Sequence, residues 1–371
     1  MSRSQSQLNP RQRVLAALSH IEPDRIPFAW NFGTTPEMTK VMVAAMASQS
    51  VDWLALAKTV DDIVQVAPCY TGSALPSHVD IWGIERSSQS YGSGAYDEIV
   101  RYPLSGIHDL AKIRDYPWPD PHAYDYDHFR DAVLHGDPAG QKARKLAINV
   151  CGNPFEIYCW MTGLEESLVN LLLYPDVVHT AMTQITSYFA ERLRITLDKA
   201  GDVLDILYFA DDLGGQQNLL ISKKTYRTML KPYHRRLFTL AHAMAPHAKI
   251  MFHSDGAVFN ILPDLLDAGI DVLEAVQIDT TGMDPIRLKT EFGANLSFHG
   301  GISVQNLLPN ADPPTVSRMC RELVKVFGKG GGYIAAPSHA IQVGTPPENV
   351  LAMPRAALGD AGYGQLWLQH G

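Results

Sequence analysis

The sequence has 371 residues, of which 46% are hydrophobic and 19% charged, a composition typical of a globular protein with a sizeable core. Its net charge of −8 and its lack of basic runs make nucleic acid and anionic membranes poor partners. No apolar stretch reaches the roughly 18 residues of a membrane span, and the polar start lacks the apolar segment of a signal peptide. We therefore expect a cytoplasmic protein.

The first 145 residues show little regular alternation. Arg25–Trp30 is the expected first strand, between helices expected at Arg11–Leu18 and Pro36–Ala47. Residues from about 68 to 135 are rich in Tyr, Trp, Pro and Gly, with a hairpin expected near Val79–Arg86. We interpret this segment as an irregular insertion that covers one end of the fold.

From about residue 145 onward, short apolar runs alternate with longer helical patterns, which is the rhythm of βα units. One helix is expected from Pro175 to Gly201 and another after Ser222. Because parallel strands require crossover helices, and because no internal repeat or linker divides the chain, we expect residues 1–371 to form one α/β domain. The predicted fold is a (β/α)8 TIM barrel with an N-terminal elaboration. The expected strands are Lys145–Val150, Leu204–Phe209, Lys249–Phe252, Val272–Val276, Leu296–Phe298 and Tyr333–Ala336.

Polar residues follow five successive expected strands at the point where each strand ends. In a (β/α)8 barrel the carboxyl ends of all strands meet on one face, so side chains distant in sequence share one pocket. This convergence predicts a functional site. The residues concerned are Asp211, Asp212, His253, Asp255, Glu274, Gln277, His299 and His339.

His253 and Asp255 stand two residues apart, which places both side chains on one side of an extended chain and offers two ligands to one metal ion. His339 is the expected third ligand, with a fourth position open for substrate or water, as at catalytic zinc sites. A single histidine at a strand end is more often structural. The Asp211–Asp212 pair either caps the following segment, lies in solvent with its two charges repelling each other, or contacts substrate. The residues alone leave these alternatives open.

Ten segments together resemble the uroporphyrinogen decarboxylase superfamily, and the similarity runs over nearly the full length. They are RQRVLAAL (11–18), EPDRIP (22–27), ADDLG (210–214), SKKTY (222–226), KPY (231–233), HSDG (253–256), GIDVL (269–273), FHGG (298–301), GYIAAPSH (332–339) and PEN (347–349). The resemblance implies a (β/α)8 barrel whose active site lies at the carboxyl ends of the strands.

Two activities occur in that superfamily. Its decarboxylases need no cofactor and bind a polycarboxylated tetrapyrrole through an early arginine-rich motif. Here Asn31 and Phe32 stand where that motif continues with arginine and glutamine, so the carboxylates of such a substrate would lack partners. The segments are more similar to the methyltransferase branch, which implies a zinc enzyme that works with a corrinoid protein. This chain lacks the DxHxxG signature of corrinoid-binding domains, so any cobalamin belongs to a separate partner protein.

The resemblance aligns His253 with the zinc-binding histidine of those methyltransferases, and Asp255 and His339 with two cysteine ligands. Replacing two thiolates by a carboxylate and a neutral imidazole makes the metal a stronger Lewis acid and favours oxygen ligands. We therefore expect an ether, a carboxylate or a folate-like molecule as substrate more than a thiol such as coenzyme M.

In this interpretation, zinc held by His253, Asp255 and His339 polarises a methoxyl oxygen or activates a methyl acceptor. The residues expected to position substrate or move a proton are Asp211, Asp212, Glu274 and His299. The residues expected to bind substrate are Asn31, Phe155, Tyr158, Trp160 and Gln277. The chain would thus be the demethylating or methyl-accepting component of a corrinoid-linked system.

Two other functions stay open at this stage. One is a metal-free decarboxylase of a smaller acid, with His339 and the Asp211–Asp212 pair as proton donors, and metal content would separate it from the methyltransferase. The other is a catalytically silent relative that binds a ligand or partner, which the costly charges at five strand ends argue against. The oligomeric state is open as well, a homodimer included.

Overall fold

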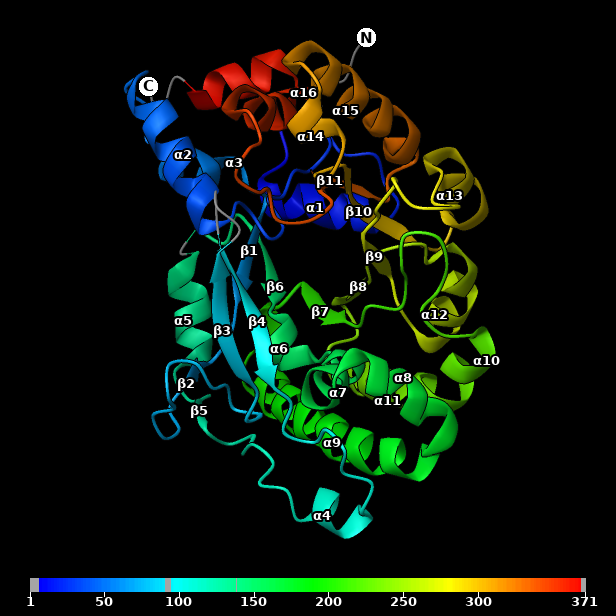
Figure 1. Ribbon diagram of the computed structural model, residues 1–371. Coiled ribbons are helices and arrows are strands. Elements are labelled where there is room, and N and C mark those ends of the chain that lie inside the picture. The colour runs from blue at the N-terminus through cyan, green and yellow to red at the C-terminus, as the bar shows by residue number, and fades with distance from the viewer. Residues whose placement is uncertain (1–6, 91–94, 138, 368–371) are drawn as a thin grey trace.

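A curled parallel sheet forms the centre of the molecule in the computed structural model, which describes residues 7–90, 95–137 and 139–367 (Figure 1). The sheet has seven strands in the order β1-β6-β7-β8-β9-β10-β11, and every neighbouring pair is parallel. The strands are β1 (Ile63–Val66), β6 (Ala143–Leu146), β7 (Ile206–Ala210), β8 (Lys249–His253), β9 (Val272–Ala275), β10 (Ser297–Ile302) and β11 (Tyr333–Pro337).

The sheet encloses a small apolar core, and its outer face packs on helices. In β7, Ile206 and Tyr208 belong to the inner core, whereas Leu207 and Phe209 belong to the larger core against the helices. The short helix α1 (Pro10–Leu18) contributes Val14 and Leu18 to the inner core. Strands buried on both faces therefore appear in the sequence as continuous apolar runs.

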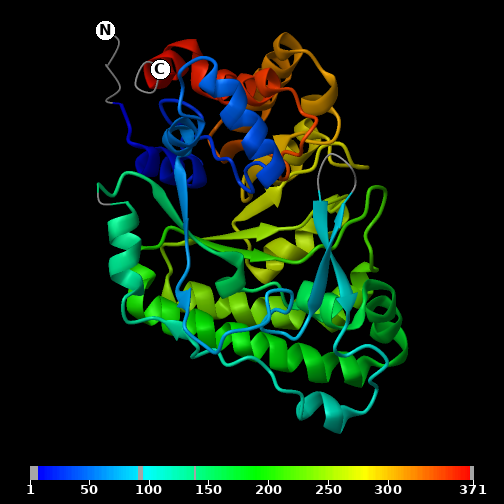
Figure 2. The same ribbon diagram turned by 60° about the vertical axis from the view of Figure 1, so that its left-hand side comes forward.

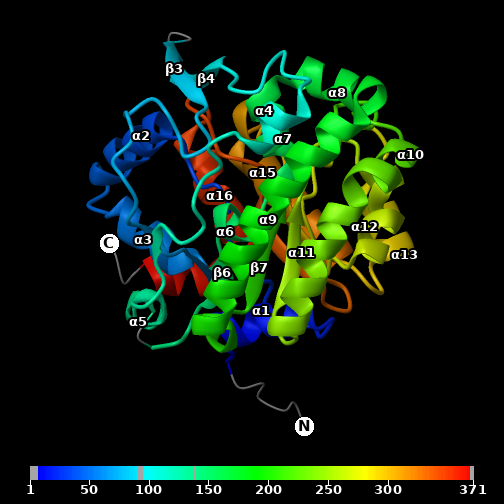
Figure 3. The same ribbon diagram turned by 90° about the horizontal axis from the view of Figure 1, so that it is seen from below.

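The larger helices surround the sheet, with α9 and α11 packed side by side (Figures 2 and 3). Among the described residues, no helix is long and apolar enough to cross a membrane. The larger helices are α2 (Pro36–Ala47), α3 (Trp53–Val60), α5 (Phe129–Gly136), α7 (Pro154–Thr162), α8 (Leu164–Leu173), α9 (Pro175–Ala200), α11 (Lys231–Met244), α12 (Leu262–Ala268), α13 (Pro285–Phe292), α15 (Pro313–Gly328) and α16 (Pro347–Trp367). Shorter helices are α4 (Leu110–Arg114), α6 (Ile148–Cys151), α10 (Lys223–Thr225) and α14 (Leu307–Asn310).

The segment expected as the first strand forms a bridge and not a regular strand. Phe28 makes a single parallel bridge with Ala335 of β11, and the Asp62 amide donates to the Phe28 carbonyl beside β1 (2.9 Å). The segment thus lies between the two edge strands. Pro27 has no amide hydrogen and Asn31 has a positive φ of 57°, so the extended stretch is short. Among the described residues, the central sheet therefore has seven regular strands where an eight-stranded barrel was predicted.

One local prediction was wrong, and another was confirmed. The run expected as one strand over Lys145–Val150 starts earlier, as β6, and its last residues form α6, because a short apolar run does not distinguish strand from helix. The hairpin expected near Val79–Arg86 is present as an antiparallel bridge between Val79 and Glu85, and a longer hairpin follows it between β3 (Glu85–Ser90) and β4 (Ala95–Arg101). The Asp80 carboxylate accepts hydrogen bonds from the Trp82 and Ile84 amides, and these bonds stabilise the tight turn between Val79 and Glu85. A second small pair joins β2 (Cys69–Tyr70) and β5 (Tyr124–Asp125).

Candidate metal-binding site

Three polar residues form one row across the sheet. His253 of β8 and His299 of β10 are both in register with Glu274 of β9. Residues in register on neighbouring strands point to the same face, so the three side chains lie together inside the curled sheet. All three are buried.

Glu274 orients His253. The Nδ1 atom of His253 lies 2.7 Å from Glu274 Oε2, and because a carboxylate only accepts, Nδ1 carries the proton. The same carboxylate accepts from the Tyr208 hydroxyl (2.5 Å) and from Asn31 Nδ2. Burial opposes both charges, but their ion pair lowers the pKa of Glu274 to about 2 and raises the pKa of His253 to about 10. This arrangement directs Nε2 of His253 away from Glu274 and toward the strand-end loops.

Two aspartates face that nitrogen. Asp212 Oδ1 lies 3.6 Å from His253 Nε2 and accepts from the Asp255 amide (2.9 Å). Asp212, His253 and Asp255 each offer a ligand atom, and these atoms lie within 4.8 Å of one another. The Oδ1 atom of Asp255 is buried and has no hydrogen-bond partner among the described residues. A buried carboxylate oxygen without a donor is costly, and a divalent cation would stabilise it, so the three residues fit a metal ion.

Glycine residues bring the loop that carries Asp212 into contact with the loop that carries Asp255. A Cβ atom at Gly256, whose φ is +86°, would lie 2.5 Å from the carbonyl carbon of Gly214. The Ala257 amide also donates to the Gly215 carbonyl (2.8 Å). Only glycine permits this approach, which brings the loop after β7 and the loop after β8 together.

His339 lies at the exposed rim of the site. Its ring centroid is 6.4 Å from that of His253, and it is not part of the close group formed with the two aspartates. Phe32 stacks on His339 (4.8 Å) and meets His253 edge-on (5.3 Å). Phe32 was not among the site residues predicted from the sequence, although it stands beside Asn31, where the arginine-rich decarboxylase motif is lost. Ligation by His339 stays a prediction.

The Asp211 carboxylate stabilises the start of helix α7. Its carboxylate accepts from the amides of Phe155 (3.0 Å) and Glu156 (2.7 Å) at the start of α7. It also contacts His234 Nε2 (2.7 Å) and is fully buried, and this burial raises its pKa. Asp211 therefore supports the start of α7, which precedes it in the chain, and not the following segment named by the capping alternative.

Three further polar groups surround the site. His299 is buried with no hydrogen bond to either ring nitrogen among the described residues, and burial lowers its pKa to about 4, so it is neutral. Lys145, which sequence reasoning missed, lies with Nζ 4.2 Å from the Tyr208 ring centroid. Glu156, also missed, has a pKa raised to about 8 by burial and by the nearby Asp211 and Asp212 carboxylates.

The residues predicted to bind substrate lie in three different places. Asn31 contacts Glu274, and Gln277 accepts from the Gly256 amide (2.9 Å) beside the aspartate loops. Phe155 and Tyr158 are fully buried in the packed core around α7, where the Tyr158 hydroxyl accepts from Asn170 (3.1 Å). The half-buried Trp160 lines a different cavity.

A cavity of about 650 Å³ adjoins the metal-binding group. Asp255, Gln277, Ser338 and His339 belong to its wall. The remaining wall adds the amide side chains of Gln305, Asn310 and Gln342, and the described lining residues include no lysine or arginine. Such a cavity suits a neutral molecule with hydrogen-bonding groups better than a polyanion.

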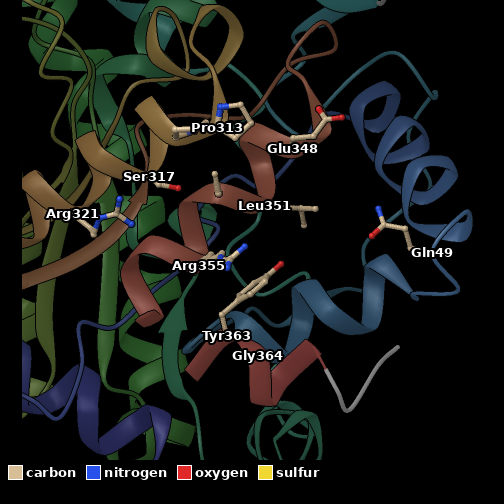
Figure 4. Close-up of a pocket in the computed structure, with 11 residues that line it drawn as sticks. Gln49, Pro313, Ser317, Arg321, Glu348, Leu351, Arg355, Tyr363 and Gly364 are labelled. Atoms are coloured by element: carbon tan, nitrogen blue, oxygen red, sulfur yellow. The ribbon is translucent and has the colours of Figure 1, made fainter. Parts of the chain in front are cut away.

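A larger cavity of about 980 Å³ lies between α15, α16 and Gln49, which follows the end of α2 (Figure 4). Arg321, Glu348, Arg355 and Tyr363 are among its lining residues, and it shares no described lining residue with the metal-binding group. Its size therefore does not identify it as the reaction site.

We expect Glu274→Gln to weaken divalent-metal binding by about 10- to 100-fold, because an amide no longer fixes the Nδ1 proton and ring orientation of His253. Competition of the protein with a zinc-sensitive dye measures the affinity. Glu291→Gln, at an exposed position on α13, is the matched control and should leave the affinity unchanged. Equal affinity of Glu274→Gln and wild type would contradict the orienting role.

Together, the curled parallel sheet and the carboxylate and imidazole group beyond its strand ends define an α/β protein with a site suited to a metal ion. Residues 102–358 match the family described as Uroporphyrinogen decarboxylase (URO-D), and the chain belongs to this family.

Two curated relatives and one solved structure illustrate the range of similarity. A uroporphyrinogen decarboxylase of Coxiella burnetii is 26% identical over 267 residues, covering 70% of this chain and 68% of the relative. A methylated-thiol–coenzyme M methyltransferase of Methanosarcina mazei is 25% identical over 359 residues, covering 95% of this chain and 89% of the relative. The solved structure of a methyltransferase from Methanosarcina mazei superposes with a TM-score of 0.62 at 18% identity, covering 94% of this chain and 98% of that one. At 18% identity, this superposition shows that the two proteins share a fold.

Proposed function

We propose that this chain is a zinc-dependent methyltransferase that exchanges the methyl group of a small methylated molecule with a separate corrinoid protein. The observation that carries the proposal is the Asp212, His253 and Asp255 group, with its buried and unpartnered carboxylate oxygen. The methyltransferase relative supports it, since its similarity covers 95% of this chain.

Asp212, His253 and Asp255 would hold the metal, with His339 as a further ligand or a substrate contact at the rim. The metal would supply Lewis acidity toward an oxygen of the substrate. Because the close group contains one imidazole and two carboxylates but no thiolate, it favours a hard metal centre and oxygen ligands. Glu274 directs Nε2 of His253 toward the aspartates, where a metal ion would displace the proton that the raised pKa keeps on this nitrogen. Gln277 holds the loop of Asp255 through the Gly256 amide.

The side chains that line the adjoining cavity indicate which class of substrate fits there. Besides Asp255 and His339, its described wall carries amides and hydroxyls but no lysine or arginine, so a neutral methyl ether with hydroxyl groups fits better than the carboxylate or folate-like molecule expected from the sequence. A polycarboxylated tetrapyrrole would require several cationic partners there. Phe32 would shield the rim from water through its contacts with His253 and His339.

A decarboxylase acting on a smaller acid is the second candidate, and the similarity to uroporphyrinogen decarboxylases favours it. In that reaction His339 or the half-exposed Asp212 would deliver the proton. The absence of lysine and arginine from the described wall of the adjoining cavity argues against it, because an acid substrate needs a partner for its carboxylate.

The test combines metal analysis with a methyl-transfer assay. Protein purified without chelators is expected to carry about one zinc ion per chain. It should form methylcobalamin from cob(I)alamin and 2-methoxyethanol, and removal of the metal should abolish this reaction. A protein that neither carries nor takes up metal, or that releases carbon dioxide from a carboxylic acid without metal or corrinoid, would overturn the proposal.

We expect Asp255→Asn to weaken the metal site, because it removes the negative charge and keeps the shape. Asp255→Cys should retain binding but shift the preference toward soft ions, because thiolate donates more charge to the metal than carboxylate does. Metal competition with zinc and cadmium measures both effects. If Asp255 only caps the following turn, Asn should serve equally well, so equal metal content in Asp255→Asn and wild type would refute ligation.

A further inference from the structure

Lys145 of β6 places an amine inside the curled sheet. Ala143, two residues earlier on the same strand, belongs to the inner core, so the Lys145 side chain points to the same inner face. Tyr208 of the neighbouring strand β7 also belongs to this core, and Nζ of Lys145 lies 4.2 Å from the Tyr208 ring centroid. The amine is therefore held against the face of an aromatic ring, within the electrostatic influence of Glu274.

No described carboxylate is paired with this amine. Lys145 is 4% exposed, and its Nζ forms neither a hydrogen bond nor an ion pair with a described residue. Glu274 and Asp61 act on it only through longer-range charge, and burial still lowers the pKa of the Lys145 amine. The Glu274 carboxylate is instead engaged by Tyr208 and His253. Because a buried lysine with a purely structural role normally has an anionic partner, this amine calls for another explanation.

Open space adjoins the amine on the side of β1. Gln65 of β1 is in register with Lys145, so the two side chains point to the same inner face. Gln65 is exposed, whereas the preceding inner-core residues Ile63 and Ala143 are buried. Both ring nitrogens of His299 are enclosed without a partner, but the unpartnered Nζ of Lys145 is not enclosed and keeps contact with solvent. A small molecule therefore has a path to the amine past Gln65.

This environment is suited to a nucleophilic lysine. An amine attacks a carbonyl carbon only in its neutral form, and a desolvated lysine without an anionic partner is neutral in a larger fraction of molecules than an exposed lysine. The contact with the Tyr208 ring restricts the long side chain and so reduces the entropy that Nζ loses when it reacts. Because little of Lys145 is exposed, only a compound of a few non-hydrogen atoms fits beside it.

We propose that Lys145 binds a small aldehyde covalently, as an imine. The lone pair of Nζ forms the bond to the carbonyl carbon, and the carbonyl oxygen leaves as water with the two amine protons. This reaction needs no oxidant, metal or corrinoid. The site therefore goes beyond the proposed methyltransferase and does not depend on it.

Reductive trapping with propanal and sodium cyanoborohydride at neutral pH tests the proposal. The reductant converts each imine into a stable propylamine, and peptide mass spectrometry measures how fast each lysine gains the propyl group. The exposed Lys40 and Lys223 are internal controls in the same molecule. At limiting aldehyde, we expect Lys145 to react roughly tenfold faster than either control, because more of its amine is neutral. A buried lysine with only a structural role would react more slowly than both.

Two variants and a metal-free sample complete the test. Lys145→Met should lose the fast label and leave the labelling of Lys40 and Lys223 unchanged. Gln65→Trp serves as an independent variant if Lys145→Met fails to fold, since Gln65 is exposed and a larger side chain there should cover the amine and slow the labelling of Lys145. Treatment of the wild type with a chelator should leave the fast label in place.

Three results would each overturn the imine site. They are labelling of Lys145 no faster than that of the exposed lysines, unchanged labelling of Lys145 in a folded Gln65→Trp variant, and loss of the fast label on metal removal. A protein that shows the fast label but takes up no metal would keep this inference and lose the proposed function, so the two failures are distinguishable.

Discussion

Replacing His253 by alanine is expected to abolish zinc binding while the fold persists. The zinc affinity should fall by more than the roughly 10- to 100-fold expected for Glu274→Gln. His253→Ala removes a metal ligand, whereas Glu274→Gln removes only the group that orients this ligand. The inner core of Ile206, Tyr208 and Met251 does not include His253. Zinc titration against a chromogenic chelator measures the affinity, and far-ultraviolet circular dichroism checks the fold.

Companion variants identify the third ligand. If Asp212 completes the group, Asp212→Asn should reduce zinc affinity strongly and His339→Ala only weakly, because the aspartate lies 3.6 Å from His253 Nε2. The reverse order would support ligation by His339 as predicted from the sequence. His242→Ala on α11, outside the group, is the control. Full zinc affinity in a folded His253→Ala variant would contradict the metal site.

Asp62→Asn is expected to lower the free energy of unfolding by about 3–5 kcal/mol, the usual effect of breaking a buried ion pair. The Asp62 carboxylate is 1% exposed and contacts Arg13 (3.3 Å) and Arg25 (2.9 Å). It also accepts a hydrogen bond from the Phe28 amide (3.0 Å). Asp62 therefore connects the segment around Phe28, which lies between the two edge strands, to the start of β1. The substitution leaves two guanidinium groups without this charge.

Urea denaturation of wild type and Asp62→Asn measures the difference. Asp127→Asn is the control, because Asp127 pairs with Lys199 and is 81% exposed, and an exposed ion pair contributes little to stability. Equal destabilisation by the two substitutions would contradict a special role of the buried cluster.

The sequence predicted the C-terminal two thirds of the fold closely. The strand expected at Val272–Val276 is Val272–Ala275, and the helix expected from Pro175 to Gly201 is Pro175–Ala200. These elements have strong local signals, since a parallel strand buried on both faces is an apolar run and a long helix carries one apolar stripe. The N-terminal part was predicted less well, because its strands are short and its turns depend on side-chain contacts such as those of Asp80.

By itself, the sequence determined which polar residues follow the strands, since His253 and Glu274 lie at strand ends whatever surrounds them. Only the tertiary structure decided what those residues contact. Asp211 supports α7, Asp212 joins His253, and His339 lies at the rim. These outcomes depend on long-range contacts, above all the approach of Gly214 to Gly256, and no local pattern encodes such a distance.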